Sequence, residues 1–204
     1  RGSSGGHTWV GGVAVEQDAY EPTDVPRFAY TFTTPGIFVQ DDVDIRPWLA
    51  MSMSGRLDHH SEYGWFLSPR VSALFRSGDW STRMSAGNGF FGPSALTEET
   101  EAAGLTRLAV EGPLRAERGR SASIDLTHTR GALSSTVTLF GSHITDPVQV
   151  DRLAYRLRNL AKPTTNVGVD LLGIFRQSPL AITASYTYVR SREKVEGVAN
   201  DVAQ

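Results

Sequence analysis

The sequence predicts an all-β fold, an antiparallel meander of about nine strands. Apolar and polar residues alternate with a period of two along most of the chain, and helical periodicity is almost absent. Short and long connections follow one another between the alternating segments. Both observations are typical of a sheet in which strands adjacent in the sequence are also adjacent in space.

Each expected strand is an alternating segment bounded by turn-forming residues. The eighth segment is unusually long. We expect Lys162-Pro163 to divide it or to mark a bulge, because proline cannot donate to a central ladder. The segments are roughly 7–17, 36–45, 48–60, 68–76, 80–90, 117–129, 133–145, 153–176 and 180–192.

One phase of each strand is apolar and the other is polar; Met51 and Met53, for example, share a phase that excludes Ser52. A charge facing lipid at mid-membrane costs about 2–4 kcal/mol, so a lipid-facing phase should exclude charges. Two residues, Asp41 and Arg190, break this rule, and we expect both to lie outside the hydrocarbon band. The charges that obey it, all in the polar phase, are Arg56, Asp58, Arg70, Arg76, Arg83, Asp125 and Asp170.

The connection lengths favour a membrane barrel over a soluble β-sandwich, which would alternate in the same way around an inward apolar face. Membrane barrels have short periplasmic turns and longer extracellular loops. The aromatic residues Trp48, Phe75, Trp80 and Phe175 flank short turns, as at a membrane–water interface, although they would equally well plug the ends of a sandwich core. The short connections are 46–47, 77–79, 130–132 and 177–179, and the longer ones are 18–35, 61–67, 91–116 and 146–152.

Composition excludes several other classes of protein. The chain has 204 residues and a formal net charge of −2, which gives no sign of a nucleic-acid partner. It has no cysteine, so a disulfide framework and a cysteine metal site are excluded. Neither a nucleophile elbow nor a phosphate-binding glycine loop is present, so we expect no enzyme and no cofactor.

Several motifs resemble, in order, those of the barrel of TonB-dependent receptors. Residues 87–94, Gly-Asn-Gly-Phe-Phe-Gly-Pro-Ser, resemble a Gly-x-Gly-Phe-x-x-Pro-[Ser/Thr] run that precedes a large extracellular loop in that family. The resemblance covers most of residues 30–192, with Asp170 standing where glutamate is usual. The other similar segments are 37–42, 49–58, 68–70, 114–121, Asn159 with 168–171, and 185–188.

This resemblance implies that residues 1–204 are part of a large transmembrane β-barrel of about 22 strands, without its plug domain and remaining strands. It implies a Gram-negative outer-membrane location, contact with outer-membrane lipid, and active uptake of a scarce small molecule such as a ferric siderophore. The TonB complex would act through the plug. Residues 1–6 contain no apolar signal segment, so on this interpretation the natural N-terminus is missing. A passive porin-like barrel and a secreted β-sandwich binding module are the alternatives.

Ligand contacts are expected from the four longer connections. Exposed aromatic rings are common binding anchors. The acidic run in 91–116 would attract a cationic or metal-bearing ligand, although a solvated loop would have the same composition. The individual candidates are Tyr63, Trp65, Phe90, Phe91, Glu98, Glu99 and Glu101.

A pair of histidines, His59-His60, stands next to Asp58 and near Glu62, a composition that suggests a metal site. Adjacent residues of a strand point to opposite faces, so both imidazoles would not easily bind one ion. We therefore expect solvated loop residues here and no metal site.

Overall fold

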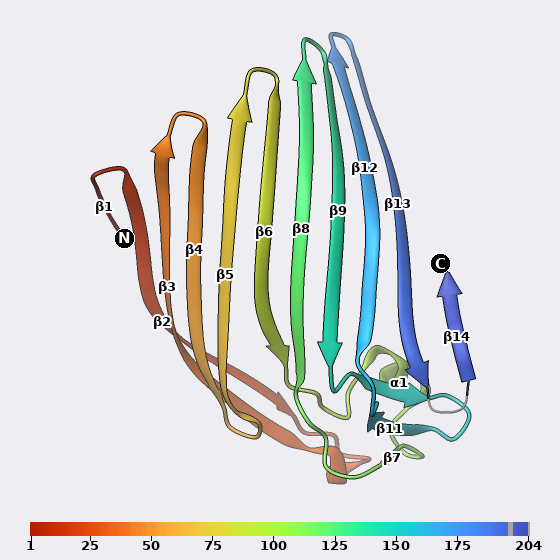
Figure 1. The fold of residues 1–204 in the computed structure, drawn as a ribbon. Coiled ribbons are helices and arrows are strands. Elements are labelled where there is room, and N and C mark those ends of the chain that lie inside the picture. The colour runs from red at the N-terminus through yellow and green to blue at the C-terminus, as the bar shows by residue number, and fades with distance from the viewer. Residues whose placement is uncertain (196–197, 204) are drawn as a thin grey trace.

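A single curved antiparallel sheet dominates the computed structural model, which describes residues 1–195 and 198–203 (Figure 1). Its edges are β1 (Gly2–Ser4) and β14 (Val198–Ala203). The strands follow the chain, except that β7, β10 and β11 belong to a separate small sheet. Between the edges lie β2 (His7–Tyr20), β3 (Tyr30–Arg46), β4 (Leu49–His60), β5 (Gly64–Ser77), β6 (Trp80–Phe91), β8 (Glu117–Arg130), β9 (Leu133–Thr145), β12 (Thr164–Gln177) and β13 (Leu180–Val195).

The expected meander is confirmed, with one strand divided. The segment expected at 153–176 breaks at Lys162-Pro163, as one of the two alternatives predicted. Its first part becomes β11 (Arg156–Asn159), which pairs with β10 (Val148–Asp151) rather than with the main sheet. Its second part is β12, which pairs with β9 and β13.

Three of the expected loops are partly strand, and one of them, 146–152, contains β10. The connection expected at 18–35 is wrong at both ends, because β2 continues to Tyr20 and β3 begins at Tyr30. The connection expected at 61–67 is also wrong, because β5 begins at Gly64. Aromatic and β-branched residues favour strands, and they fill these stretches.

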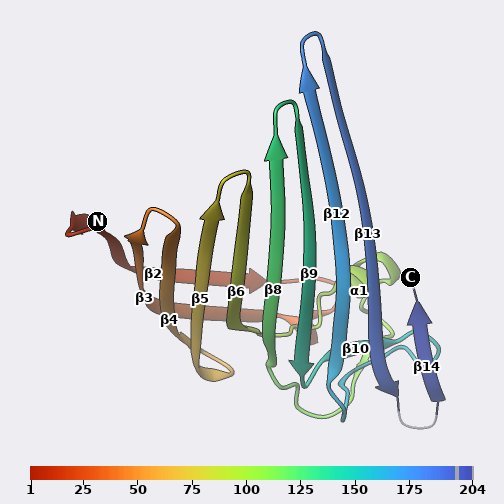
Figure 2. The ribbon, with the colours of Figure 1, turned by 45° about the horizontal axis from the view of Figure 1, so that its top comes forward.

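Short and long connections separate to opposite ends of the sheet. The turns that join β3 to β4, β5 to β6, β8 to β9 and β12 to β13 lie together at the top of Figure 1. The connections from β2 to β3, β6 to β8 and β9 to β12 lie together at the bottom, and a tilted view shows the same division (Figure 2). The alternation of connection lengths is thus confirmed, and it favours the short-turn end as the periplasmic one.

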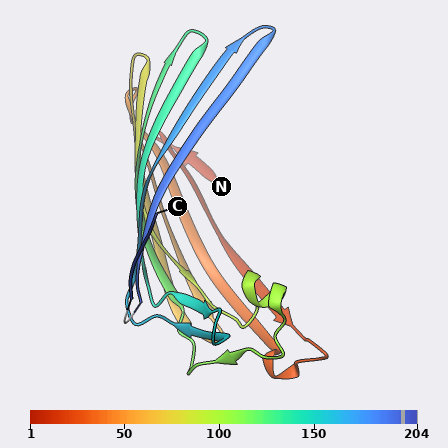
Figure 3. The same cartoon turned by 90° about the vertical axis from the view of Figure 1, so that its right-hand side faces the viewer.

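The two faces of the sheet differ in polarity as the phases predicted. Residues paired directly across an antiparallel ladder point to the same face. One row, which we assign to the outer face, is apolar and runs Met51, Ala73, Met84, Ile124, Leu139, Val169, Tyr188 across seven neighbouring strands. Large apolar side chains remain exposed on this face, among them Leu139 at 55% and Ile182 at 51%. The loops fold to the opposite, concave side (Figure 3), which we call the inner face.

Asp41 breaks the phase rule: the structure places it on the outer face, where it pairs across the ladders with Trp9 and Met53. One carboxylate oxygen lies 2.7 Å from Nδ1 of His7, so the charge has a partner. Its expected position outside the hydrocarbon band stays a prediction.

A gap opens between β5 and β6 toward the long-loop end. Their ladder ends at Arg70 and Gly87, although each strand continues to pair with its other neighbour. Pro69 directly precedes Arg70, the last residue of β5 that pairs with β6. Proline has no backbone N–H to donate, and at this position the β5–β6 ladder needs none. The rings of Phe66 and Phe90 fill the gap, stacked with centroids 3.8 Å apart.

The long connections pack together into a unit that we call the cap, formed by residues 21–29, 92–116 and 146–163. It contains η1 (Pro26–Phe28), α1 (Glu98–Ala103) and a small sheet in which β7 (Ala109–Val110) lies parallel to β11. Its core consists of buried residues from all three segments, each exposed by 6% or less: Val25, Leu105, Leu108 and Leu157. Among the described residues, no helix is long and apolar enough to cross a membrane.

Candidate functional site

A cavity of about 330 Å³, which we call the chamber, lies on the inner face at the long-loop end. Strands β2, β3 and β4 form its walls, and the end of β6 with the start of the following loop closes one side. Its lining combines carboxylates, one guanidinium, one imidazole and aromatic rings: Glu16, Asp18, Phe32, Thr34, Arg56, Asp58, His60, Phe90, Phe91 and Gly92.

An ion pair between a half-exposed arginine and a buried carboxylate fixes the polar wall of the chamber. Arg56 Nε donates to both carboxylate oxygens of Asp58, at 2.8 and 2.9 Å, and Asp58 is only 2% exposed. The two residues are separated by one residue on β4 and therefore share a face. Opposite Asp58 on β3 stands Gly36, where a Cβ would lie 2.1 Å from the carboxylate Oδ1. The pair therefore requires a residue without a side chain at this position.

We predict that Gly36→Ala displaces Asp58 and lowers the stability of the folded receptor by about 2 kcal/mol, because the buried carboxylate loses its hydrogen bonds from Arg56. Gly55→Ala on β4 is the control, since a Cβ there meets nothing within 4 Å. Thermal unfolding of the purified full-length variants, followed by heat-dependent gel mobility, would measure both. Equal unfolding temperatures for Gly36→Ala and wild type would contradict the role assigned to the pair.

An aromatic cluster forms the other wall. The His60 ring lies 4.9 Å from both Phe32 and Tyr63, measured between centroids. Backbone N–H groups of Glu62 and Tyr63 donate to Nδ1 of His60, so this nitrogen is an acceptor. The Tyr63 hydroxyl donates to the carbonyl of Pro93 at 2.6 Å, and burial raises the pKa of this phenol to about 12. Tyr63 thereby fastens the loop after β6 to the turn after β4.

Two further carboxylates, Glu16 and Asp18, enter the chamber from β2. They face β3, where Glu16 pairs with Thr34 and Asp18 with Phe32. The hydroxyl of Tyr30 donates to Asp18 at 3.2 Å. With only Arg56 as a counter-charge, the described lining is acidic and suits hydrogen-bond donors and cationic groups.

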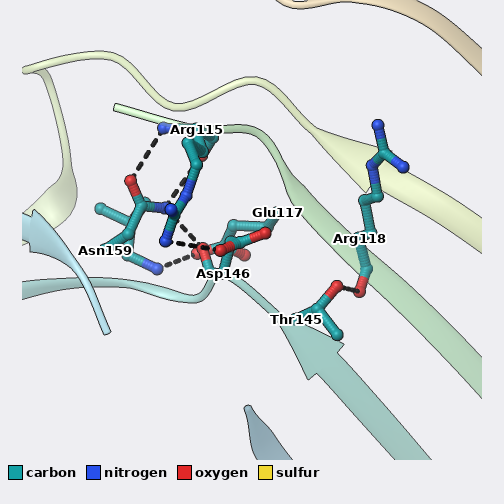
Figure 4. A network of polar contacts seen from close by, with 7 residues as sticks. Arg115, Glu117, Arg118, Thr145, Asp146 and Asn159 are labelled. Atoms are coloured by element: carbon teal, nitrogen blue, oxygen red, sulfur yellow. Dashed lines mark hydrogen bonds and ion pairs between the residues drawn. The ribbon is translucent and has the colours of Figure 1, made fainter. Parts of the chain in front are cut away.

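A network of polar contacts joins the cap to the wall (Figure 4). Asn159 Nδ2 donates to the carbonyls of Arg115 and Asp146, at 2.9 and 2.6 Å, and its Oδ1 accepts from the Arg115 N–H at 2.8 Å. Arg115 also forms an ion pair with Asp146 at 2.7 Å, and Glu117 accepts the N–H of Val148. The sequence motif 114–121 and the motif that contains Asn159 thus meet in space. Their contacts hold the cap against the wall.

Three of the seven expected ligand contacts lie in or beside the chamber. Phe91 lines it from the inner phase, and Tyr63 packs against its His60. Phe90 pairs with Arg118 in the outer phase, and its ring contributes to the lining from the gap between β5 and β6, where it stacks on Phe66. Trp65 does not: its phase is the outer one, it is 65% exposed, and its ring lies 4.7 Å from that of His59.

The three glutamates lie in the first turn of α1, outside the chamber lining. Negative charge there stabilises the helix N-terminus. Thr97 caps the helix by accepting the N–H of Thr100 at 3.2 Å, and Glu99 accepts the Thr97 hydroxyl. A helix-stabilising role therefore accounts for their positions, and ligand contact by Glu98, Glu99 and Glu101 stays a prediction.

The expectation that His59 and His60 are solvated loop residues is wrong, because both belong to β4 and His60 is only 6% exposed. They point to opposite faces, as strand geometry requires. Within the part of the chain that the structure describes, no group of three or more His, Asp or Glu side chains is placed to hold a metal ion.

The sequence did not single out Glu16, Asp18, Phe32 or the Arg56–Asp58 pair as site residues. Asp18 and Phe32 do lie in 18–35, one of the connections from which ligand contacts were expected. For Glu16, Arg56 and Asp58 the available signal was a charge in the polar phase near a long connection. The alternation of apolar and polar residues in β2 and β3 does not predict the curvature that brings these strands over the inner face.

Solved structures with the same fold are receptors and transporters. The siderophore receptor PirA from Pseudomonas aeruginosa aligns with a TM-score of 0.73 and 16% identity, over 91% of this chain and 39% of that one. The FrpB iron transporter from Neisseria meningitidis (F3-3 variant) aligns with a TM-score of 0.63 and 18% identity, over 79% and 26%. A mutant of the ferric enterobactin receptor PfeA from P. aeruginosa gives 0.58 and 14%, over 80% and 27%. No curated protein sequence matches.

The fold is therefore a sector of an outer-membrane β-barrel, and the chain spans less than two-fifths of the structures that it matches. The family model described as TonB dependent receptor-like, beta-barrel, matches residues 4–203, so the chain belongs to the TonB-dependent receptor barrels. The location is the outer membrane of Gram-negative bacteria, and the family is one of transporters, not enzymes. The β-sandwich alternative is excluded.

Proposed function

We propose that this chain forms part of the wall and ligand-binding end of a TonB-dependent receptor that takes up a ferric siderophore. The observation that carries the proposal is the chamber: a cavity with aromatic and polar lining at the end of the barrel wall where the long connections gather. Ligand pockets typically combine apolar walls with a few fixed polar groups. Siderophore and iron receptors among the similar structures support this class of ligand.

In the proposed mechanism the ligand binds from the extracellular side and contacts the aromatic wall first. Phe91, 57% exposed, presents a large apolar surface at low conformational cost. The Arg56–Asp58 pair holds its charges in fixed positions, so polar groups of the ligand meet preorganised partners. Transport then requires the plug domain of the complete receptor and energy delivered by the TonB complex, both partners that we propose from family membership.

Phe91 and Trp65 provide a matched test, because both are exposed aromatic residues at the same end of the wall, but only Phe91 lines the chamber. We predict that Phe91→Ala in the full-length receptor weakens ligand binding by about tenfold or more, since it removes an anchor of the chamber. Trp65→Ala should leave binding unchanged. Uptake of radioactive iron as siderophore complexes by whole cells, with surface levels of each variant measured, would show the difference.

Two outcomes would count against the proposal. If Trp65→Ala impairs uptake and Phe91→Ala does not, the ligand does not enter the chamber. If uptake persists in cells without TonB, the passive porin-like alternative explains transport better than active import does.

A further inference from the structure

The outer face carries a segregated distribution of charge at its long-loop end. Arg118 and Arg120 on β8 share the outer face with Ile124 and Leu126, since they lie an even number of residues away. They are exceptions to the phase rule beyond the two expected from the sequence, Asp41 and Arg190. Both arginines are exposed. His143 lies opposite Arg120 on β9, and Arg190 occupies the same face of β13.

Carboxylates are scarce on this face where the structure describes the side chains, that is, from β2 to Arg192 of β13. Among side chains that the structure describes in the paired strands, Asp41 is the outer-face carboxylate, and it lies toward the short-turn end with His7 as its partner. The acidic residues near the long-loop end, Glu16, Asp58 and Glu117, belong to the inner phase. The described part of the outer wall is therefore basic at its extracellular end, around Arg118, Arg120 and His143.

The height of these arginines matches the edge of a bilayer. Arg120 lies ten residues along β8 from Arg130, which ends that strand at the short turn. Ten residues of a strand tilted as in membrane barrels rise by roughly 25 Å, the height of the apolar band. Arg190 lies the same ten residues beyond Leu180, the first residue of β13. On this count both side chains lie at the height of the headgroups of the outer leaflet.

A groove lies directly beneath Arg120. Ala86, Ala122 and Gly141 form one register row across β6, β8 and β9, and their small side chains leave the wall hollow. The open groove measures about 460 Å³ and is almost entirely apolar, with Arg120, His143 and Thr165 along its upper side. The next row toward the short turns is bulky: Met84, Ile124 and Leu139.

We propose that this groove and its arginines bind a phosphorylated glycolipid of the outer leaflet. One acyl chain occupies the row of small residues, and a phosphate group lies against Arg120 and Arg118. Guanidinium groups bind phosphate strongly, and basic residues at a membrane surface attract anionic lipid. The site is on the opposite face from the chamber, so it does not depend on the identity of the transported ligand.

Binding of purified full-length receptor to lipid A, a bis-phosphorylated glycolipid, and to its dephosphorylated form would test the proposal by native mass spectrometry. Wild type should prefer the phosphorylated form. R118Q/R120Q should bind it about thirtyfold more weakly, with two surface arginines lost. R130Q is the matched control, on the same strand and face but at the short-turn end, and should bind as wild type does.

Arg118 also lies over the Phe66 ring at 5.4 Å, so R120Q alone provides a variant that leaves this contact in place. Gly141→Leu should be tolerated by the fold, because a Cβ there meets only ordinary contacts of 3.5 and 3.7 Å. The leucine side chain should fill the groove and thereby weaken binding of both lipid forms. Equal affinity of wild type for the two lipid forms, or unchanged binding by both arginine variants, would overturn the proposal. Unchanged binding by Gly141→Leu would overturn the assignment of the groove to the acyl chain.

Discussion

Leu139→Arg in the full-length receptor is expected to abolish most barrel assembly, whereas Thr138→Arg is expected to be tolerated. Leu139 is 55% exposed on the outer face, between Ile124 and Val169 of the neighbouring strands. An arginine facing lipid near the middle of the membrane costs about 2–4 kcal/mol. That cost is a large fraction of the stability of an ordinary folded protein.

The adjacent substitution is a control for size and charge. Thr138 lies on the inner face, where its hydroxyl donates to Asp125 at 2.7 Å and it pairs with Asp170. An arginine there meets two carboxylates and no lipid. Heat-dependent gel mobility and the amount of protein in the outer membrane would measure assembly. Equal loss for the two variants would contradict the assignment of the faces.

The strands were predictable because alternation is a local signal. Residues 80–90 were expected as a strand, and β6 spans Trp80–Phe91. The errors came from residues that interrupt a local pattern without ending a strand. Pro35 made 18–35 look like a loop, yet it pairs with Val15 within β3. The start of β5 was missed for another reason: Gly64 begins the strand, and Trp65, Phe66 and Leu67 that follow are all apolar and do not alternate.

The small sheet of the cap was not predictable from alternation. Its strands are short and depend on residues far apart in the sequence, such as Arg115 and Asn159, which are 44 residues apart. The parallel pairing of β7 with β11 brings Ala109 to Arg156. Local periodicity carries no information about such contacts.

The candidate site was predictable only in part, for the same reason. Phe90, Phe91 and Tyr63 were recognisable because exposed aromatic rings near a long loop are common binding anchors. The chamber also needs Glu16 and Asp18, which reach it because β2 and β3 bend over the inner face (Figure 3). A phase assigns a side chain to a face, but the curvature of that face decides which side chains meet.

Replacing residues 95–111 with a Gly/Ser linker is expected to leave the barrel assembled but to weaken ligand uptake by about tenfold or more. The ladder from β6 to β8 ends at Phe91 and Glu117, so the deletion removes no pairing of the main sheet. It removes Leu105 and Leu108, and burial of each such side chain is worth about 1.5–3 kcal/mol. The remaining cap then lacks half of its buried core.

The consequences should therefore extend beyond the deleted loop. Arg27 donates to the carbonyls of Thr106 and Leu108, and the Tyr155 hydroxyl donates to that of Gly104. Loss of these acceptors should make residues 21–29 and 152–155 more sensitive to protease on intact cells. Leu153→Ser is the control, because Leu153 is fully exposed in the same cap and its loss should change neither uptake nor cleavage.

Whole-cell uptake and protease mapping of the deletion variant would decide the matter together. A separate receptor that keeps residues 95–111 and carries an epitope near Glu99 would report the side of the membrane. Uptake at the wild-type level after the deletion would remove this loop from ligand binding. Unchanged cleavage of 21–29 would show that the three segments of the cap do not stabilise one another. An epitope reached only from the periplasm would reverse the orientation, and the basic end of the outer wall would then face the inner leaflet.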